Sequence, residues 1–266
     1  MKAKKSLGQN FLKDEKILND IFHSFDATKD DLIIEIGPGK GALTKRIKDK
    51  HSRIIAYEID TDLIPFLNKI NADNLIIKNQ DFLLSDLKND IKSIKNDKLF
   101  IIGNLPYYIT TPIIKYIIDS GLFVDEMLFM VQEEVANRFS AKPGAKDYGS
   151  MTLYLNYFFK VEKLFKVSKK CFDPEPKVES AIIKLTRRDR TFKVDESKYF
   201  KLIDDAFTQK RKTLKNNLKD YDWNKIVEIL KKHNLNELVR AEELDEEIFI
   251  EICNLWVINY PLNHKI

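Results

Sequence analysis

The stretch NLPYYIT, at residues 104–110, combines residue types that can bind an amine and the base that carries it. The side-chain oxygen of Asn104 and the backbone carbonyl of Leu105 can accept hydrogen bonds from an exocyclic adenine amine. Two acceptors would draw the amine nitrogen, whose lone pair is delocalised into the ring, toward the sp³ geometry of a nucleophile. Pro106 stiffens the turn that directs the carbonyl, and the Tyr107 ring can stack on a base taken out of a helix. The alternative is that Asn104 caps the next turn and that both tyrosines belong to the core.

A glycine-rich turn precedes this stretch, in the sequence EIGPGKGALT at residues 35–44. Gly37, Gly39 and Gly41 permit a tight turn and let a ligand approach the backbone N–H groups. Such a loop is compatible with NAD, FAD or S-adenosylmethionine, and tight turns without any ligand also use glycine. The spacing is G-x-G-x-G rather than the G-x-G-x-x-G of a dinucleotide site, and this difference favours S-adenosylmethionine.

Acidic residues stand at the ends of two further apolar runs, in YEID and NQDFL. Glu58 lies about 20 residues past the glycine loop, where an acidic side chain can bind both hydroxyls of a ribose. Asp60 is an alternative for that role, and a solvated charge at a strand end is the simpler explanation. Asp81 can accept a hydrogen bond from an adenine amino group. With Asn104, these residues share one location, the carboxyl ends of strands, where open α/β sheets bind ligands.

Short apolar runs alternate with helical patterns up to about residue 188. The pattern predicts strands at 31–37, 53–60, 74–81, 98–104 and 126–132, with helices at 41–49, 61–70 and 111–119. Strands that alternate with helices form βαβ units, so we expect a parallel sheet covered on both faces. Two later strands, at 160–168 and 179–188, are expected to be antiparallel at the sheet edge. The loop between them, CFDPEPKV, contains two prolines that exclude regular structure.

After about residue 189 only helical periodicity remains, in the segments 197–218, 223–233 and 245–258. We therefore expect two domains, an α/β domain at 1–188 and a small all-helical domain at 189–266. The first of the helices carries an apolar face and a neighbouring basic face. The apolar face contains Ile203, Phe207, Leu214 and Leu218, and the basic face contains Arg211, Lys212, Lys215 and Lys219. The basic face can bind nucleic-acid phosphates, although a run of charges is often only a solvated face.

Composition excludes some classes of protein. Hydrophobic residues make up 44% and charged residues 32% of the 266 residues, as in soluble proteins with a core. No apolar run approaches the roughly 18 residues of a membrane span, and no apolar segment follows the basic N-terminus, so neither membrane insertion nor secretion is expected. The two cysteines and four histidines form no metal pattern. The net charge of +4 is a weak indication of an acidic partner such as nucleic acid.

A series of motifs along the chain resembles the bacterial small-subunit (16S) ribosomal RNA adenine dimethyltransferase family. In order, these motifs are SLGQNFL, IGPGKGALT, YEID, QDF, GNLPYYIT, FDPEPKVES and AFTQKRKTLKNNL, and they cover nearly the whole chain. The resemblance implies a Rossmann-like, seven-stranded class I methyltransferase sheet with a helical C-terminal domain that binds rRNA. It further implies a cytoplasmic enzyme, expected to be a monomer without a metal, that acts late in small-subunit assembly. Such enzymes use S-adenosylmethionine to dimethylate two adjacent adenosines in a hairpin loop near the 3′ end of the rRNA.

The resemblance also implies roles for individual residues. It implies cofactor contacts at Asn10, Leu12, Gly37, Glu58, Asp81 and Asn104, to which the glycine loop adds Gly39. It implies that Phe172 helps Tyr107 to hold the target base. Lys210 and Lys215 replace the arginines that the family often has, and a lysine lacks the two-pronged geometry of a guanidinium.

Three other functions are consistent with parts of the sequence. The enzymes that methylate large-subunit (23S) rRNA and confer macrolide resistance share N-L-P-Y and the glycine loop, but the AFTQKRKTLKNNL segment favours the small-subunit family. A non-catalytic ribosome assembly factor would not need Glu58, Asp81 or N-L-P-Y. An NAD-dependent dehydrogenase disagrees with the glycine spacing and with the lack of an evident proton-transfer residue.

Overall fold

The computed structural model describes residue 4 and residues 7–50, 52–189 and 192–259. Contacts between residues divide the chain into two compact units. Unit 1 comprises Met1–Ala136 and Glu162–Arg187, and unit 2 comprises Asn137–Val161 and Arg188–Ile266. The division therefore groups residues 137–161 with the C-terminal segment, which the sequence pattern did not indicate. The functions expected of the ranges 1–188 and 189–266 stay predictions.

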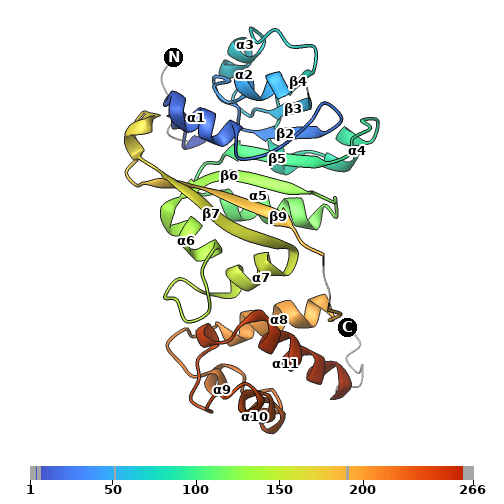
Figure 1. Ribbon diagram of the computed structural model, residues 1–266, viewed down its shortest axis with the longest axis vertical. Coiled ribbons are helices and arrows are strands. Elements are labelled where there is room, and N and C mark those ends of the chain that lie inside the picture. Colours follow the sequence, from blue (N-terminus) through green and yellow to red (C-terminus); the bar gives the residue numbers. More distant parts are fainter. Residues whose placement is uncertain (1–3, 5–6, 51, 190–191, 260–266) are drawn as a thin grey trace. The chain divides into compact units, whose positions relative to one another are not determined.

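A seven-stranded sheet is the main feature of unit 1 (Figure 1). In spatial order the strands are β4 (Leu75–Lys78), β3 (Arg53–Tyr57), β2 (Leu32–Ile36), β5 (Leu99–Asn104), β6 (Glu126–Gln132), β9 (Ser180–Arg187) and β7 (Phe159–Val167). The first five pair in parallel, β9 is antiparallel to β6, and β7 forms the edge. The predicted α/β fold with seven strands is confirmed.

The order of the strands creates a switch point between β2 and β5. The chain runs from β2 outward to β3 and β4, and then returns to β5 on the other side of β2. In open α/β sheets, ligands bind outside the carboxyl ends of the strands at such a point. The glycine loop begins directly after β2, and Asn104 is the last residue of β5. The topology therefore brings the two most informative motifs of the sequence to one place.

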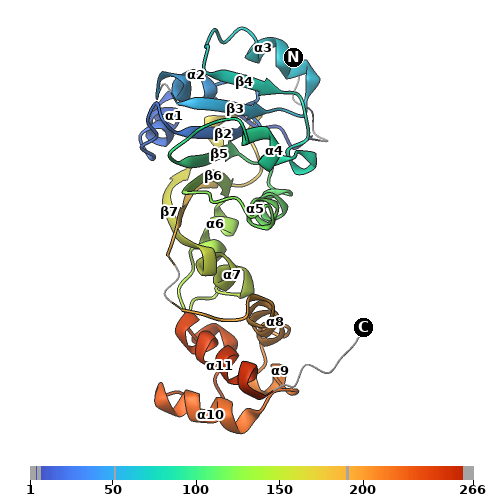
Figure 2. The same ribbon diagram turned by 90° about the vertical axis from the view of Figure 1, so that its right-hand side faces the viewer.

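Helices cover both faces of this sheet (Figure 2). On one face lie α1 (Glu15–Phe22) and α2 (Thr44–Ile47), and on the other lie α4 (Leu87–Ile91) and α5 (Thr110–Asp119). The predicted helix at 111–119 is confirmed, whereas those at 41–49 and 61–70 are short α-helices, α2 and α3 (Ile64–Leu67), joined to 3₁₀ turns. The sequence pattern missed α1 and α4, and also α6 (Glu133–Phe139) and α7 (Ser150–Phe158).

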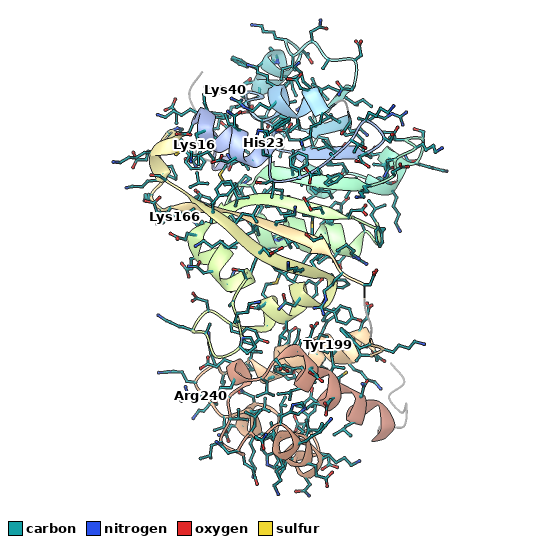
Figure 3. The ribbon with its side chains drawn as sticks, viewed as in Figure 1. Lys16, His23, Lys40, Lys166, Tyr199 and Arg240 are labelled. Carbon is teal, nitrogen blue, oxygen red and sulfur yellow. The ribbon has the colours of Figure 1, made fainter. Side chains whose placement is uncertain are left out.

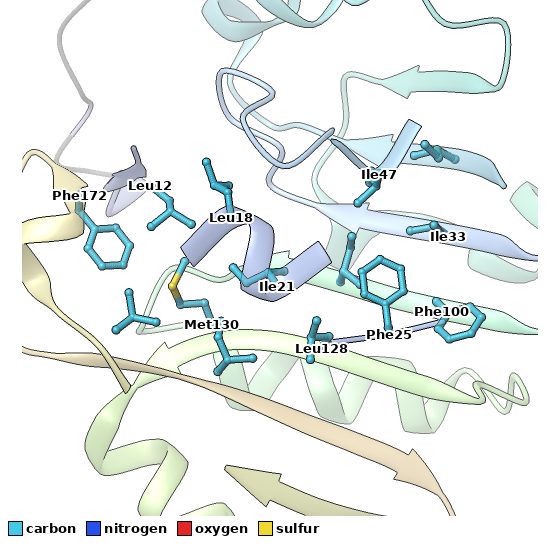
Figure 4. Close-up of a cluster of buried hydrophobic side chains, with 14 residues drawn as sticks. Leu12, Leu18, Ile21, Phe25, Ile33, Ile47, Phe100, Leu128, Met130 and Phe172 are labelled. Carbon is cyan, nitrogen blue, oxygen red and sulfur yellow. The ribbon is translucent and has the colours of Figure 1, made fainter. Parts of the chain in front are cut away.

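Helix α1 closes the core on its face of the sheet (Figure 4). The Asp14 side chain caps the helix by accepting a hydrogen bond from the Ile17 N–H. Leu18 and Ile21 are buried, and they belong to one cluster with apolar residues of the central strands such as Met130. This packing holds the N-terminal segment against the sheet next to the switch point.

The N-terminal motif forms a small sheet of its own with the proline loop. Strand β1 (Phe11–Leu12) pairs in antiparallel register with β8 (Phe172–Asp173). The expectation that the prolines exclude regular structure from this loop is therefore wrong for its first residues. The reason is that Phe172 and Asp173 precede Pro174, so their backbone groups are still able to form ladder hydrogen bonds.

Unit 2 is built from α7, α8 (Glu196–Ala206), α9 (Leu214–Asn217), α10 (Trp223–Lys232) and α11 (Glu246–Asn259). Helix α8 packs against α7 and α11. Tyr199 of α8, labelled in Figure 3, is fully buried and stacks on Tyr157, with the two ring centroids 5.2 Å apart. The predicted helices at 223–233 and 245–258 correspond to α10 and α11. None of the helices in the described part of the chain is long and apolar enough to span a membrane.

The single helix predicted at 197–218 is wrong, because the chain leaves the helical path after Ala206 and resumes it at Leu214. The Asn217 side chain supplies a physical reason for the break. Its Nδ2 donates to the Ala206 carbonyl at 2.6 Å and to the Gln209 carbonyl at 3.2 Å. These bonds satisfy carbonyl groups at the end of α8 from a residue further along the chain, so the turn is stable without a continuous helix.

Candidate active site

A cavity of about 490 Å³ lies at the carboxyl ends of β2, β3, β4 and β5. This volume is in the range of pockets that enclose small molecules. Residues 7–13 of the N-terminal segment form part of its wall. Ten of the residues predicted for cofactor binding and methyl transfer line it: Asn10, Leu12, Gly37, Gly39, Glu58, Asp81, Asn104, Leu105, Pro106 and Tyr107. The structure therefore brings together residues that are far apart in the sequence.

Glu58 is fixed by the backbone on both of its oxygens. Its Oε2 accepts a hydrogen bond from the Gly39 N–H at 2.9 Å, and its Oε1 accepts one from the Asp60 N–H at 2.8 Å. Only 4% of the residue is exposed, so it is not a solvated charge. Burial raises the pKa of the carboxyl group above its usual value, against the opposing effect of these bonds. A carboxylate can accept about four hydrogen bonds, so each oxygen still has capacity for a ligand hydroxyl.

Asp60 has different hydrogen-bond partners from Glu58, and this difference distinguishes the two candidates for a ribose contact. Its Oδ1 accepts from Lys4 Nζ at 2.5 Å, and its Oδ2 accepts from Gln9 Nε2 at 2.7 Å. Burial acts to raise the pKa of Asp60, but the bonds from Lys4 and Gln9 outweigh it and hold that pKa below its usual value. Asp60 thus holds the N-terminal segment over the edge of the sheet, which leaves Glu58 as the acid that faces the glycine loop.

Asp81 also combines a structural bond with a remaining acceptor. Its Oδ1 accepts from the Leu83 N–H at 2.9 Å, which caps the short 3₁₀ turn Phe82–Leu84. Within the described part of the chain, no donor is recorded for its Oδ2. The residue lines the cavity beyond the end of β4, which two strands separate from the β5 strand of Asn104, on the side of Glu58. Its position is therefore consistent with the predicted acceptor for an adenine amino group.

Asn104 is held by the N-terminal segment. Its Nδ2 donates to the backbone carbonyl of Asn10 at 3.0 Å, and this leaves Oδ1 as an acceptor. No backbone N–H of the described residues donates to this Oδ1, so the interpretation of Asn104 as a cap of the next turn is wrong, and the N-cap position of α5 is Ile109. The Leu105 N–H donates to the Met130 carbonyl at 3.3 Å. Among the described residues, no donor is recorded for the Leu105 carbonyl oxygen, the second predicted acceptor.

The two tyrosines after Pro106 have different environments. The Tyr107 hydroxyl forms a hydrogen bond of 2.7 Å with Oγ of Ser180, a fully buried residue of β9. Burial raises the pKa of Tyr107 above its usual value. The bond fixes the end of a half-buried ring that lines the cavity. Tyr108 is 63% exposed, so the interpretation of both tyrosines as core residues is wrong.

Phe172 is the predicted site residue that the structure does not bring to the cavity. It is only 2% exposed and belongs to the core cluster shown in Figure 4, near Leu12. In this arrangement the Phe172 ring is enclosed by core residues, and its contact with the target base stays a prediction. Its place on β8 makes it an anchor for the β1 strand that carries Leu12.

Glu35 is a feature of the site that the sequence reasoning missed. It lies in the middle of the apolar strand β2, lines the cavity and is fully buried. Thr44 Oγ1 donates to its Oε2 at 2.7 Å. Burial raises the pKa of Glu35 to about 7, and the nearby Glu58 carboxylate adds to this effect. A lone acid inside the apolar run DLIIEIG was the signal that could have identified it.

The four cations predicted to contact nucleic acid, Arg211, Lys212, Lys215 and Lys219, belong to unit 2 and are called the basic cluster below. They do not form a helical stripe, because only Lys215 lies on α9, whereas two of the others precede that helix and one follows it. All four are exposed, and no ion pair is recorded for them within the described part of the chain. Lys215 Nζ lies 5.5 Å from the centre of the Trp223 ring, where a cation is weakly attracted.

Comparisons with known proteins agree with this geometry. The family described as Ribosomal RNA adenine dimethylase matches residues 1–257. The chain belongs to this family. As a member of it, this dimethylase is an S-adenosylmethionine-dependent rRNA adenine methyltransferase, which confirms the resemblance read from the motifs.

Two relatives of similar length to this chain have the same name. Ribosomal RNA small subunit methyltransferase A of Mycoplasma mobile is 40% identical over 248 residues, which cover 92% of this chain and 95% of the relative. The protein of the same name from Streptococcus sanguinis is 42% identical over 258 residues, which cover 92% of this chain and 89% of the relative.

Solved structures show the same fold at lower identity. A dimethyladenosine transferase from Plasmodium falciparum has a TM-score of 0.78 at 24% identity, over 93% of this chain and 98% of that one. The 23S rRNA methyltransferase ErmE has a TM-score of 0.75 at 24% identity, over 92% of this chain and 98% of that one. The dimethylase therefore has a class I methyltransferase fold. Because the two scores are so close, the fold does not distinguish between the two ribosomal subunits.

Proposed function

We propose that this dimethylase transfers methyl groups to N6 of two adjacent adenosines in a hairpin loop near the 3′ end of small-subunit (16S) rRNA, late in subunit assembly. The observation that carries the chemistry is the pair of oxygen acceptors at the end of β5, beside the glycine loop. The names of the relatives support the small subunit as the substrate. In this proposal the enzyme acts in the cytoplasm, as a monomer and without a metal.

The residues around the cavity fit S-adenosylmethionine. The Glu58 carboxylate, held by Gly39 and Asp60, retains acceptor capacity for the two ribose hydroxyls. Asp81 offers an oxygen to the adenine amino group, and Gly37, with its positive φ of 66°, presents backbone to the cofactor without a side chain. Asn10 and Leu12 form the wall contributed by the N-terminal segment. When bound, the cofactor supplies an electrophilic methyl group on a positively charged sulfur.

In this mechanism, Asn104 and Leu105 position the nucleophile. The Asn104 Oδ1 and the Leu105 carbonyl oxygen would accept the two amine hydrogens of the target adenine and so orient its nitrogen. With the cofactor bound, each transfer would form one N–C bond and break one S–C bond, and the amine would give up one proton. Neither oxygen is a base at neutral pH, so the proton passes to water. Positioning and charge stabilisation lower the barrier.

The second transfer uses the same acceptors. After the first methyl group is in place, the amine keeps one hydrogen, and one of the two oxygens is enough to orient it. Tyr107 stacks on the target base, and its bond to Ser180 keeps the ring in place during both transfers.

The basic cluster supplies rRNA affinity in this proposal. Its four exposed cations are not neutralised by recorded ion pairs in the described part of the chain, so they remain available to phosphates. Contacts of this kind position the RNA without reading its sequence.

The test is a comparison of the two ribosomal subunits as substrates. Purified protein is incubated with labelled S-adenosylmethionine and with small or large subunits from cells that lack the modification. We expect label in the small subunit alone, at two adjacent adenosines located by primer extension. Label in the large subunit would instead identify an enzyme of the ErmE type, and binding without label would identify a non-catalytic assembly factor.

A further inference from the structure

Tyr108 presents an exposed aromatic ring at the mouth of the cavity. It lines the cavity together with Tyr107, yet 63% of it is exposed. Single exposed apolar residues are common and need no explanation. Tyr108 differs from such residues because it lies beside the transfer site and because its surroundings restrict its position.

The N-terminal segment supports the Tyr108 ring. Gly8 has a φ of 61°, and a Cβ added there would lie 3.4 Å from Cε1 of Tyr108 and 3.6 Å from Cβ of Pro106. The ring therefore packs close to the Gly8 backbone. Asn10 fixes that backbone in turn, since its Nδ2 donates to the Gly8 carbonyl at 3.1 Å. One side of the ring is supported, while most of its surface remains accessible.

Tyr107 and Tyr108 are consecutive residues whose side chains have different environments. Tyr107 is half-buried and tied to Ser180, whereas Tyr108 is open to solvent. When one base enters the cavity, the next base of the same strand has to remain near the mouth, where Tyr108 presents its exposed ring.

We propose that Tyr108 is the stacking platform for the base next to the target adenosine. This inference rests on the proposed function, and it adds a residue that selects a substrate with an unpaired neighbouring base. Every base offers a π-face, and an adenine offers a large one, so an adenosine next to the target would bind well there. The residue would raise affinity for the RNA rather than the rate of methyl transfer.

The experiment is a double-mutant cycle across protein and RNA. Small subunits are reconstituted with rRNA whose hairpin segment is joined by ligation, so that either adjacent adenosine can be replaced by an abasic site. KM and the single-turnover rate at saturating subunit are measured for wild type and for Tyr108→Ala. With intact rRNA, Tyr108→Ala should raise KM by about 5-fold to 100-fold, and it should leave the saturated rate unchanged. With rRNA that has an abasic site next to the target adenosine, Tyr108→Ala should change KM little relative to wild type.

Matched variants separate this role from a general disturbance. Tyr108→Phe keeps the ring and should behave as wild type. Phe123→Ala removes a side chain that is 62% exposed but lies outside the cavity lining, and it should leave KM unchanged. S-adenosylmethionine affinity, measured by calorimetry, should be the same in Tyr108→Ala as in wild type.

Equal losses for Tyr108→Ala on intact and abasic rRNA, at both positions, would overturn the inference. A wild-type protein that methylates no small-subunit adenosine would instead overturn the proposed function, so the two failures are distinguishable.

Discussion

Replacing Asn104 with alanine tests the positioning of the amine most directly among single substitutions. The change removes the Oδ1 acceptor and also the bond from Nδ2 to the Asn10 carbonyl. Loss of one preorganised polar group from a reaction site raises the barrier by about 2.7–4 kcal/mol, and a lost hydrogen bond in the scaffold adds about 0.5–1.5 kcal/mol. Together these losses amount to roughly 3–5.5 kcal/mol, which corresponds to a rate reduced by about 10²–10⁴.

The assay is single-turnover methylation of unmodified small subunits at saturating S-adenosylmethionine. Saturation is needed because Asn104 also contacts the N-terminal wall of the cofactor cavity, so a weaker cofactor affinity is expected as well. Asn74→Ala is the matched control. The Asn74 Nδ2 donates to the carbonyls of Lys48 and Ser52, at 3.1 Å and 2.7 Å, and the residue lies outside the cavity lining. It should reduce stability and leave the saturated rate nearly unchanged.

A second variant, Asn104→Asp, separates the two functions of the side chain. It keeps an oxygen acceptor but loses the donor to Asn10, so it should destabilise the N-terminal wall, and its rate should lie between those of wild type and Asn104→Ala. A saturated rate for Asn104→Ala within about fivefold of wild type, a barrier change near 1 kcal/mol, would show that Asn104 does not position the amine.

Four further predictions concern the cofactor, the base, the RNA and the buried acid. Glu58→Ala should weaken S-adenosylmethionine binding by about 1.5–3 kcal/mol in calorimetry, and an unchanged affinity in a folded variant would exclude its ribose contact. Tyr107→Ala should cost about 1–3 kcal/mol of base capture in methylation assays, while Tyr107→Phe, which loses only the bond to Ser180, should be much milder; equal damage would contradict stacking. Charge reversal of the whole basic cluster should reduce the slope of log affinity for subunits against log salt by about 3, with cofactor affinity unaltered, and an unaltered slope would mean a solvated face. Burial raises the pKa of Glu35 to about 7 in the folded protein. The contribution of Glu35 to the free energy of unfolding is therefore greatest at a pH below the pKa that this residue has in the unfolded chain, and it is lost as pH rises through about 7. Glu35→Gln should therefore be more stable than wild type at about pH 8, by up to about 3 kcal/mol in denaturant titrations, and an identical pH dependence of the two proteins would contradict this.

The sequence predicted the parallel sheet and most of the cavity because both depend on short-range patterns. Apolar runs between turn signals identified the strands. The acidic or amide residues at the ends of these runs identified the side of the sheet on which the carboxyl ends of the strands lie. Once the strands were in order, Glu58, Asp81 and Asn104 had to lie at one end of the sheet. The choice between Glu58 and Asp60 could not be made from the pattern, because it depends on Lys4 and Gln9, which are over 50 residues away.

The failures have long-range causes as well. The break after Ala206 depends on a bond from the Asn217 side chain, which helical periodicity does not reveal. The burial of Phe172 depends on the pairing of β8 with β1, two segments about 160 residues apart in the chain. The raised pKa of Glu35 depends on complete burial and on the nearby Glu58 carboxylate, so a single acid in an apolar run points to the residue but does not give its protonation state.

The most direct test of the central claim is mass spectrometry of rRNA after complete methylation in vitro. Small subunits that lack the modification are incubated with wild-type protein and S-adenosylmethionine, and the rRNA fragments are sequenced by mass. We expect two adjacent adenosines near the 3′ end, each heavier by two methyl groups on N6, and no such change with Asn104→Ala over the same time. Methyl groups at any other position, or a single methyl group on each adenosine at completion, would contradict it.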